Sequence, residues 1–553
     1  MVPAAAAVVL AIYVALSLFN PSVAGYLSTD TGGKTATLEY MSREGTLTPS
    51  VGYWAEEFDP EGQVHPFWFT DRVGDAWVNV TTLPVLYAAL PLYELGGYHL
   101  ALLLPMLGGV ASAFAARSIA RRLAGGDQWS VFWLAALASP LAIYSLDFWE
   151  HTIGAAFTLW GFRALLEVWK RPTTWSMAAL AGAAFGAGAS MRTEVVVFGF
   201  AAVAVVCLDL LRRRLLLSAV VQGTLAAVGF GALATANSLL EKAALDEVRR
   251  AGRAATTASV GGGKLGLRIE EAFITGFGLF PTDDITFVAM GVVFFALLAG
   301  VVAMGRSQPE SVPLVFIVVA GLLFLRALSG LGFVPGATAT VPLIAAAAVA
   351  GWRHASLRIP LLIAAVAVPL VWAFQFTGGA VPQWGGRYLL PGSILLLSVG
   401  AVALQKLGND VLLKGFAVLS VLITLFGLGW THQRTNDFSD ALHGLADRPE
   451  PALIFEPAFM AREAGPLMLD EQWLTAATDE SIPVATNVLR QAGIDEFGYI
   501  DLVGEAEVAD ATADQADAIS DAKPIDGYNA IDVGFIEVTS GAHFRITTYV
   551  TQP

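Results

Sequence analysis

Long apolar windows recur along this chain and constrain its fold more than any other feature. A bilayer-crossing helix needs about 20 mostly apolar residues, and about 13 windows meet that length. Only 14% of residues are charged and mean hydropathy is +0.61, whereas a soluble surface needs roughly a quarter of its residues charged. We therefore predict a polytopic α-helical membrane protein with about 13 transmembrane helices. The windows are 3–25, 98–118, 128–147, 152–170, 174–191, 194–211, 216–238, 284–305, 312–332, 335–352, 359–377, 388–405 and 411–430.

The acidic residues gather at the C-terminal end. The net charge is −15, and residues 431–553 hold 22 Asp and Glu against 6 Lys and Arg. This segment alternates short apolar runs with helix-like stretches, so we predict a small soluble α/β domain over 431–553 after a transmembrane module over 1–430. Its charge would repel phosphate and argues against nucleic acid as a partner. The single Cys207 excludes a disulfide framework, a cysteine-ligated zinc site and an iron–sulfur cluster.

Basic residues in the short loops predict the orientation. If the N-terminus is cytoplasmic, every second loop is basic and faces inward, as the positive-inside rule requires. We predict a plasma-membrane location with the C-terminal domain outside. Two long segments, 26–97 and 239–283, then become outer loops, and the proline-broken run 82–96 is read as interfacial. A cleaved signal peptide over 1–25 remains the competing interpretation of the first window.

Ionisable residues collect at the predicted outer ends of the helices, where such groups tend to mark function. Each has a simpler interpretation as a helix cap, a local ion pair, a solvated loop residue or an interfacial anchor. They are Asp30 and Lys34 after the first window; Glu56, Glu57, Asp59 and His65 in the first loop; Asp147, Glu150 and His151 in one turn; Arg192 and Glu194 in the next; and Arg387 with Tyr388 before the twelfth window.

Together these residues suit transfer of a sugar from a lipid-linked phosphate. The departing phosphate needs fixed positive charge, for which the planar guanidinium is well shaped. The acceptor hydroxyl needs a carboxylate base within hydrogen-bond reach. Arg192 and Arg387 are the candidates for the phosphate, with Lys34 and Tyr388 beside them, and Asp30 is the candidate base. Asp147, Glu150, His151, Glu194 and His65 are expected to line the substrate pocket.

The chain resembles the GT-C superfamily of polyprenyl-phosphate-dependent glycosyltransferases, and within it the protein mannosyltransferase and aminoarabinose transferase branch. The resemblance rests on Asp30, the 144–152 stretch YSLDFWEHT, the 191–194 stretch MRTE and the 386–391 stretch GRYLLP. It covers about residues 1–430 and implies an inverting reaction without a nucleotide sugar. Many members carry an acidic pair after the first helix, whereas here Thr31-Gly32-Gly33-Lys34 follows Asp30, so Glu56 and Glu57 are alternative bases.

We therefore expect a glycosyltransferase, hexosyl or pentosyl, that uses a polyprenyl-phosphate-linked sugar in the bilayer and a glycan, lipid or protein acceptor outside. No cofactor is required by the sequence, and a divalent metal on Glu56, Glu57 and Asp59 is left open. Two alternatives also remain open: a transporter or flippase of a lipid-linked sugar, and a ligase that uses a lipid-diphosphate glycan. The C-terminal domain could bind the acceptor or pack on the first loop as a lid.

Overall fold

The chain forms two compact units. In the computed structural model the described residues are 2–19, 25, 29–67, 69–79, 82–248, 265–280, 285–305, 309–374, 383–513, 515–539 and 541–552. Met1–Leu16 and Leu103–Trp430 make one unit, here called the membrane unit. Ser17–Leu102 and Thr431–Pro553 make the other, here called the loop–tail unit. The predicted first outer loop thus shares a unit with the C-terminal tail.

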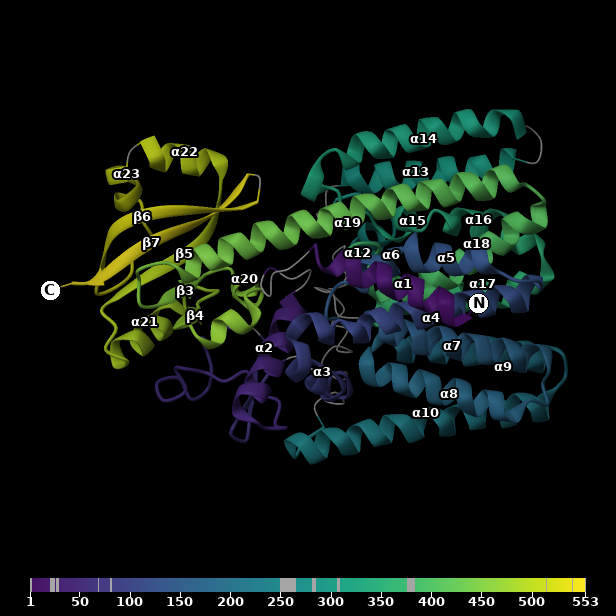
Figure 1. Cartoon of the computed structure of the whole chain (residues 1–553), viewed down its shortest axis with the longest axis horizontal. Helices are drawn as coiled ribbons and strands as arrows, with labels where there is room; N and C mark the ends of the chain where they lie inside the picture. Colours follow the sequence, from purple (N-terminus) through teal and green to yellow (C-terminus); the bar gives the residue numbers. More distant parts are fainter. Residues whose placement is uncertain are drawn as a thin grey trace. The chain divides into compact units, whose positions relative to one another are not determined.

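The membrane unit is helical, and its helices follow the predicted apolar windows closely. Within the described ranges, seven helices are long and apolar enough to cross a membrane, which confirms a multi-pass membrane protein; the number of crossings stays a prediction. The helices of this unit, which Figure 1 labels, are α1 (Val2–Ser17), α4 (Leu103–Ala124), α5 (Trp129–Leu137), α6 (Pro140–Tyr144), α7 (His151–Lys170), α8 (Trp175–Met191), α9 (Glu194–Arg212), α10 (Leu216–Leu245), α12 (Leu265–Phe277), α13 (Ile285–Met304), α14 (Val312–Ala327), α15 (Ala337–Thr340), α16 (Leu343–Ala350), α17 (Arg358–Phe374), α18 (Leu390–Leu407) and the first part of α19 (Asp410–Ala446).

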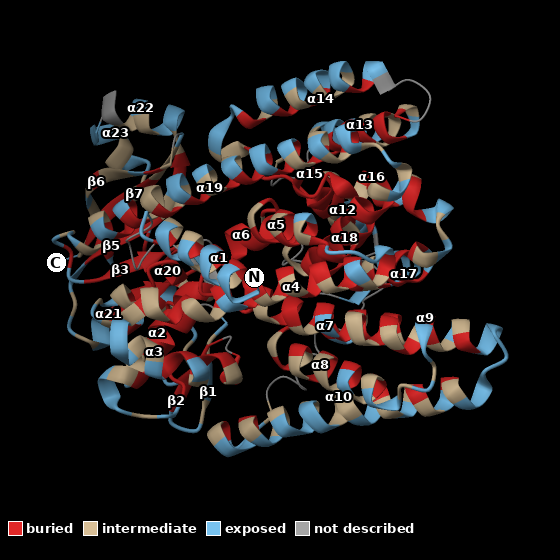
Figure 2. Cartoon of the chain, turned by 45° about the vertical axis from the view of Figure 1, so that its right-hand side comes forward, coloured by how far each residue is buried: buried red, intermediate tan, exposed pale blue. Residues whose placement is uncertain are grey.

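Burial separates inner from outer helices in this unit. The apolar window of α18 is 83% buried, whereas that of α10 is only 17% buried, and Figure 2 shows the same contrast between buried α18 and largely exposed α14. The exposed side chains of α14 are apolar, for example Ile317, Leu322 and Leu325. A soluble protein rarely exposes so large an apolar patch, so these faces are the ones that meet lipid.

Two predicted windows break at prolines. Residues 128–147 form α5 and α6, which are separated at Ser139, whose Oγ accepts a hydrogen bond from the backbone N–H of Leu141 as an N-cap. Residues 335–352 form α15 and α16 with Pro342 between them. Proline cannot donate the backbone hydrogen bond that a continuous helix needs. The predicted windows were defined by hydropathy alone, so they did not include these breaks.

The first part of the loop–tail unit is more ordered than a loop. It holds two helices, α2 (Thr29–Glu44) and α3 (Leu83–Ala101), and an antiparallel hairpin of β1 (Asp71–Val73) and β2 (Ala76–Val78). The run 82–96, which we predicted as a short interfacial segment, lies in the 19-residue α3. The kink at Gly96 and Gly97 lies near its end, and Pro84 stands in its first turn, where a missing N–H costs nothing.

The tail forms the predicted α/β domain. Its five-stranded sheet has the order β4-β3-β5-β7-β6, with parallel pairing among the first three strands and antiparallel pairing among the last three. The strands are β3 (Leu453–Phe455), β4 (Trp473–Thr475), β5 (Glu496–Gly504), β6 (Tyr528–Thr539) and β7 (Ala542–Thr551). Its helices are α20 (Ala458–Arg462), the 3-10 helix η7 (Gly465–Leu469), α21 (Ile482–Gln491), α22 (Glu505–Ala513) and α23 (Gln515–Ser520).

The first loop supplies side chains to both faces of this sheet. Along β3, Leu453 and Phe455 enter one apolar cluster and Ile454 enters the other, as the two-residue period of a strand requires. The first cluster also holds Trp77 from β2, and the second holds Val64. Because each cluster is completed by the first loop, the loop and the tail fold as one core.

Candidate functional site

The first candidate cluster lies in the membrane unit and centres on Arg192. This residue ends α8, and its guanidinium bonds two carboxylates: Nη1 donates to Glu150 Oε1 at 3.2 Å and Nε to Glu194 Oε1 at 3.0 Å. Glu150 is the N-cap of α7 and Glu194 is the first residue of α9. All three side chains are at least nine-tenths buried. The ends of three helices are therefore tied together by one buried arginine.

A second arginine of the same cluster comes from the 3-10 helix η6 (Arg387–Leu389), directly before α18. The Arg387 guanidinium carbon lies 4.8 Å from the ring centroid of Tyr388 and 5.2 Å from that of Trp149. The Arg192 guanidinium lies 5.2 Å from the same Tyr388 ring. The structure thus brings Arg192, Arg387 and Tyr388 together. Cation–π contacts of this kind hold a guanidinium in place without neutralising its charge.

The turn between α6 and α7 completes the cluster. Asp147 and His151 are buried beside Glu150. The His151 ring stacks on Tyr144, with centroids 5.5 Å apart and planes 12° apart, and lies 4.0 Å from the centroid of Trp149. The membrane-unit residues that we predicted for the site therefore lie in one group of polar and aromatic side chains, in which Arg387 and Tyr388 are half-buried and the others are buried.

The second candidate cluster lies in the loop–tail unit and contains Asp30. Asp30 stands in the first turn of α2, where the helix dipole favours a negative charge. Its Oδ1 accepts a hydrogen bond from Arg462 Nη2 at 3.3 Å, and the same Nη2 donates to Asn79 Oδ1 at 3.0 Å. The Asn79 amide in turn donates to Thr70 Oγ1 at 2.8 Å. Arg462 is only 1% exposed, so the tail places a buried guanidinium against the predicted base.

The Gly32-Gly33 pair permits this arrangement. A Cβ on Gly32 would lie 1.7 Å from the backbone oxygen of Arg462, and a Cβ on Gly33 would lie 2.3 Å from Asn79 Oδ1. A side chain at Gly32 would push α2 away from α20, and one at Gly33 would displace the Asn79 side chain. Close packing thus explains why glycines follow Asp30 in this chain, where many members of the family that it resembles carry an acidic pair.

The other predicted residues of the loop–tail unit lie in different surroundings. Lys34 is one turn after Asp30 on α2 and is buried. Glu56 is half-buried and forms a 2.7 Å ion pair with Arg72, while Glu57 is exposed. The assignment of the base stays a prediction.

His65 is part of the loop core. Its Nε2 lies 3.1 Å from the Gly52 oxygen, and its Nδ1 accepts from the Phe67 backbone N–H at 3.1 Å, so the neutral ring fits both bonds. Burial lowers the pKa of His65 to about 4. This environment indicates a structural residue, which the sequence could not distinguish from a pocket residue.

The carboxylates of the first loop do not fit a divalent metal. Asp59 Oδ2 accepts from the Tyr53 hydroxyl at 2.8 Å and from the Val64 N–H at 3.0 Å, and its Oδ1 accepts from the Gln63 N–H at 3.0 Å. Across the part of the chain that the structure describes, no group of three or more His, Cys, Asp and Glu side chains is placed to hold a metal.

Arg462 and Asn79 were not among the residues predicted for the site. Nothing near them in the sequence marks them, since Arg462 follows an ordinary helical run and Asn79 a short strand. The only available signal was indirect: Gly-Gly inside a helix that begins with the candidate base indicates that another backbone approaches there.

Comparison with known proteins gives similarity at the level of structures only. No protein-family model matches the sequence, and no curated protein matches it significantly. The structure is similar to that of ArnT from Cupriavidus metallidurans bound to undecaprenyl phosphate, at 13% identity and a TM-score of 0.48, covering 98% of this chain and 97% of that chain. It is also similar to the oligosaccharyltransferase AglB from Archaeoglobus fulgidus in complex with an inhibitory peptide and a dolichol-phosphate, at 12% identity and a TM-score of 0.45, covering 89% and 69%. With TM-scores below 0.5 these likenesses assign no role to any residue, so we base the functional proposal on the two clusters above.

Proposed function

We propose that this chain is a membrane glycosyltransferase that moves a sugar from a polyprenyl-phosphate carrier to an acceptor at the outer membrane face, with inversion at the sugar carbon. The observation that carries the proposal is that Arg192 and Arg387, from the ends of different helices, contact the same Tyr388 ring. Buried ionisable groups are expensive in a membrane protein and persist where function needs them.

The arginine pair suits the donor phosphate. A guanidinium has five N–H donors, so Arg192 can bind a phosphate while it keeps its bonds to Glu150 and Glu194. Those carboxylates hold its side chain in one orientation, and the aromatic rings of Trp149 and Tyr388 do the same for Arg387. Fixed positive charge of this kind stabilises a leaving phosphate as its negative charge develops.

Asp30 suits the acceptor. Its carboxylate is partly exposed, with 23% of the side chain accessible, while its partner Arg462 is buried. The contact engages Oδ1 and comes from the protein interior, so Arg462 acts as a positioning residue that orients the carboxylate. A base held in one orientation reacts faster than one that must be ordered first.

The proposed step balances without a cofactor. The acceptor hydroxyl oxygen attacks the anomeric carbon, and its proton passes to the Asp30 carboxylate. The bond between the anomeric carbon and the phosphate oxygen breaks, and both of its electrons leave with the polyprenyl phosphate. Arg387 and Arg192 bind that phosphate. The proton on Asp30 then returns to water.

A transfer assay on the full-length protein in lipid nanodiscs tests the proposal. With a lipid-monophosphate sugar as donor, Asp30→Asn should lower the rate at least a hundredfold, the usual scale for a general base, while Asp495→Asn should leave it near normal. Asp495 is an exposed carboxylate of the same unit and serves as the matched control. Full activity of Asp30→Asn would overturn the assignment of the base.

The released lipid, together with a transport measurement in sealed vesicles, separates the alternatives. Release of a lipid monophosphate supports the proposed reaction, and release of a diphosphate would instead identify the ligase. Movement of the lipid-linked sugar across a vesicle membrane without any covalent product would identify a transporter.

A further inference from the structure

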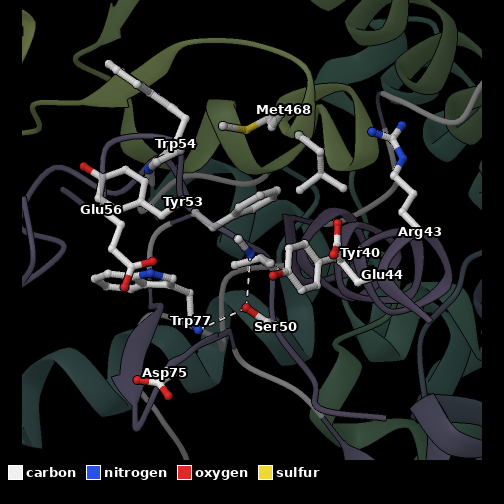
Figure 3. Close-up of a pocket in the computed structure, with 15 residues that line it drawn as sticks. Tyr40, Arg43, Glu44, Ser50, Tyr53, Trp54, Glu56, Asp75, Trp77 and Met468 are labelled. Atoms are coloured by element: carbon white, nitrogen blue, oxygen red, sulfur yellow. Dashed lines mark hydrogen bonds between the residues drawn. The ribbon is translucent and has the colours of Figure 1, made fainter. Parts of the chain in front are cut away.

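A pocket in the loop–tail unit lies apart from Asp30 on the same helix. It is formed by the C-terminal part of α2, the first loop around β2, and η7 of the tail (Figure 3), and has a cavity volume of about 360 Å³. Small-molecule sites range over roughly 300–1,000 Å³. Tyr40, on its wall, follows Asp30 by ten residues, which at the α-helical rise is about 15 Å.

Aromatic side chains line this pocket, and contacts hold them in place. In the view of Figure 3, Tyr53, Trp54 and Trp77 lie on one side and Tyr40 on the other. The Tyr53 hydroxyl donates to Asp59 at 2.8 Å, and the Trp54 indole donates to the Trp473 carbonyl at 3.0 Å. The Tyr53 and Trp77 rings meet edge to face at 5.2 Å. Such rings are ordered before any ligand arrives, which lowers the entropic cost of binding.

The rim of the pocket is polar and carries more acid than base. Glu44, Glu56 and Asp75 contribute carboxylates, and Arg43 contributes the one guanidinium among its described lining residues. That guanidinium is already bound, since Nη1 donates to Asp470 at 2.6 Å and Nε to Glu39 at 2.5 Å. Glu56 is also paired, with Arg72 at 2.7 Å, so Glu44 and Asp75 supply the remaining negative charge. The rim therefore offers mainly hydrogen-bond acceptors and disfavours anions.

We infer that this pocket binds a sugar ring of the acceptor, and that the acceptor is a glycan without anionic groups. A pyranose has an apolar C–H face, which suits the electron-rich face of an aromatic ring, and hydroxyl groups at its edge, which donate to carboxylates. Ordered aromatic walls under an acidic rim match both features. Uronic acids and sugar phosphates would meet like charge.

A peptide fits the pocket less well. Binding of an extended peptide usually uses free backbone groups of an exposed strand edge. Here the Val51 N–H donates to the Trp77 carbonyl at 2.9 Å, and the Gly52 and Trp77 N–H groups donate to Ser50 Oγ at 3.2 and 3.1 Å. These backbone donors on the lining segments are already used, so side chains make the surface that a ligand meets.

The inference rests on the proposed function and specifies its acceptor. The pocket's distance from Asp30 along α2 implies that it holds a sugar some way from the reacting hydroxyl. Longer acceptors should therefore gain from the pocket, while a monosaccharide acceptor should not.

Calorimetric titration of the full-length protein in nanodiscs tests the inference without any sugar donor. The probes are glucosamine tetramer, N-acetylglucosamine tetramer, galacturonic acid tetramer and a neutral decapeptide. The first two should bind and the last two should not. Trp54→Ala and Tyr40→Ala should each weaken binding about threefold to tenfold, the scale of one aromatic contact. Trp175→Ala, which removes an exposed tryptophan of the membrane unit, should change nothing.

Charge reversal at the rim gives a second test that leaves the core intact. Glu44 is exposed at the end of α2, so Glu44→Lys should fold normally, weaken binding of the glucosamine tetramer and improve that of the galacturonic acid tetramer. Binding that is unchanged in all three pocket variants, or a preference for the acidic tetramer or the peptide, would overturn the inference.

The outcomes also separate this inference from the proposed function. If Asp30→Asn abolishes transfer but the pocket variants bind every tetramer normally, only the glycan site is wrong. If the tetramers bind as expected but no lipid-linked sugar is ever transferred, the pocket stands and the transferase proposal fails.

Discussion

Arg462 of the tail donates to Asp30 of the first loop at 3.3 Å, although 432 residues separate them in the sequence. The contact makes the tail part of the surroundings of the proposed base. In the proposed mechanism the tail contributes no catalytic group and acts by orienting this carboxylate.

We expect Arg462→Gln to lower kcat by at least tenfold, because the carboxylate of Asp30 would lose its orienting partner. The KM for the lipid donor should stay close to normal, since the donor phosphate is assigned to other arginines. Steady-state kinetics with a lipid-monophosphate sugar measures both. Loss of a hydrogen bond to a charged group also costs roughly 2 kcal/mol of stability, so the measurement must be made on folded protein.

Arg545→Gln is the matched control for this variant. Arg545 on β7 bonds Asp501 on the neighbouring strand β5 of the same unit. If Arg462 had only a structural role, Arg462→Gln would behave like Arg545→Gln: less protein would fold, and the kcat of the folded protein would be unchanged. A normal kcat in folded Arg462→Gln would contradict the positioning role.

Gly32→Ala should destabilise the protein by several kcal/mol, because a Cβ there would lie 1.7 Å from the Arg462 carbonyl oxygen. Within a helix the same change is normally stabilising by about 1 kcal/mol. Gly231→Ala, in α10, has no heavy atom within 4 Å of the added Cβ and should not destabilise. Thermal unfolding of the two variants should therefore move in different directions, and equal shifts would contradict the close approach of α2 to α20.

Long apolar runs in the sequence were sufficient to predict most helices of the membrane unit. The bilayer demands long apolar helices, so windows such as 194–211 and 388–405 fall almost on α9 and α18. The same reasoning placed Glu150, Arg192 and Arg387 at helix ends, which is where they meet.

The fold of the loop–tail unit could not be predicted from apolar runs in the sequence. Its core joins Trp77 and Phe67 to Phe455 and Trp473, and pairings between segments so far apart leave no local pattern. Arg462 was missed for the same reason, and α2 was overlooked because its composition is polar. Contacts between segments far apart in the sequence, rather than a local sequence pattern, determine this part of the fold.

Arg387→Gln should weaken binding of a polyprenyl monophosphate about tenfold to a hundredfold, the scale of one charge-assisted hydrogen bond. Arg192→Gln should weaken binding and also destabilise the protein, because Glu150 and Glu194 would remain buried without their partner, which costs about 3–5 kcal/mol. Lipid titration and thermal unfolding separate the two effects. Equal affinity in the wild type and Arg387→Gln would remove this residue from the donor site.

The buried His65 predicts how stability depends on pH. Its pKa in the folded protein is about 4, against about 6.5 in an unfolded chain. The unfolded state therefore binds more protons between these values, and stability falls as pH falls through the window. From pH 7.5 to pH 5.0 the loss from this group is about 2 kcal/mol. His65→Gln keeps a donor for the Gly52 carbonyl and an acceptor for the Phe67 N–H but does not titrate, so its unfolding midpoint should change less with pH. His432→Gln, at an exposed histidine of α19, should retain the wild-type slope; if all three proteins lose stability equally over this range, His65 is not the group responsible.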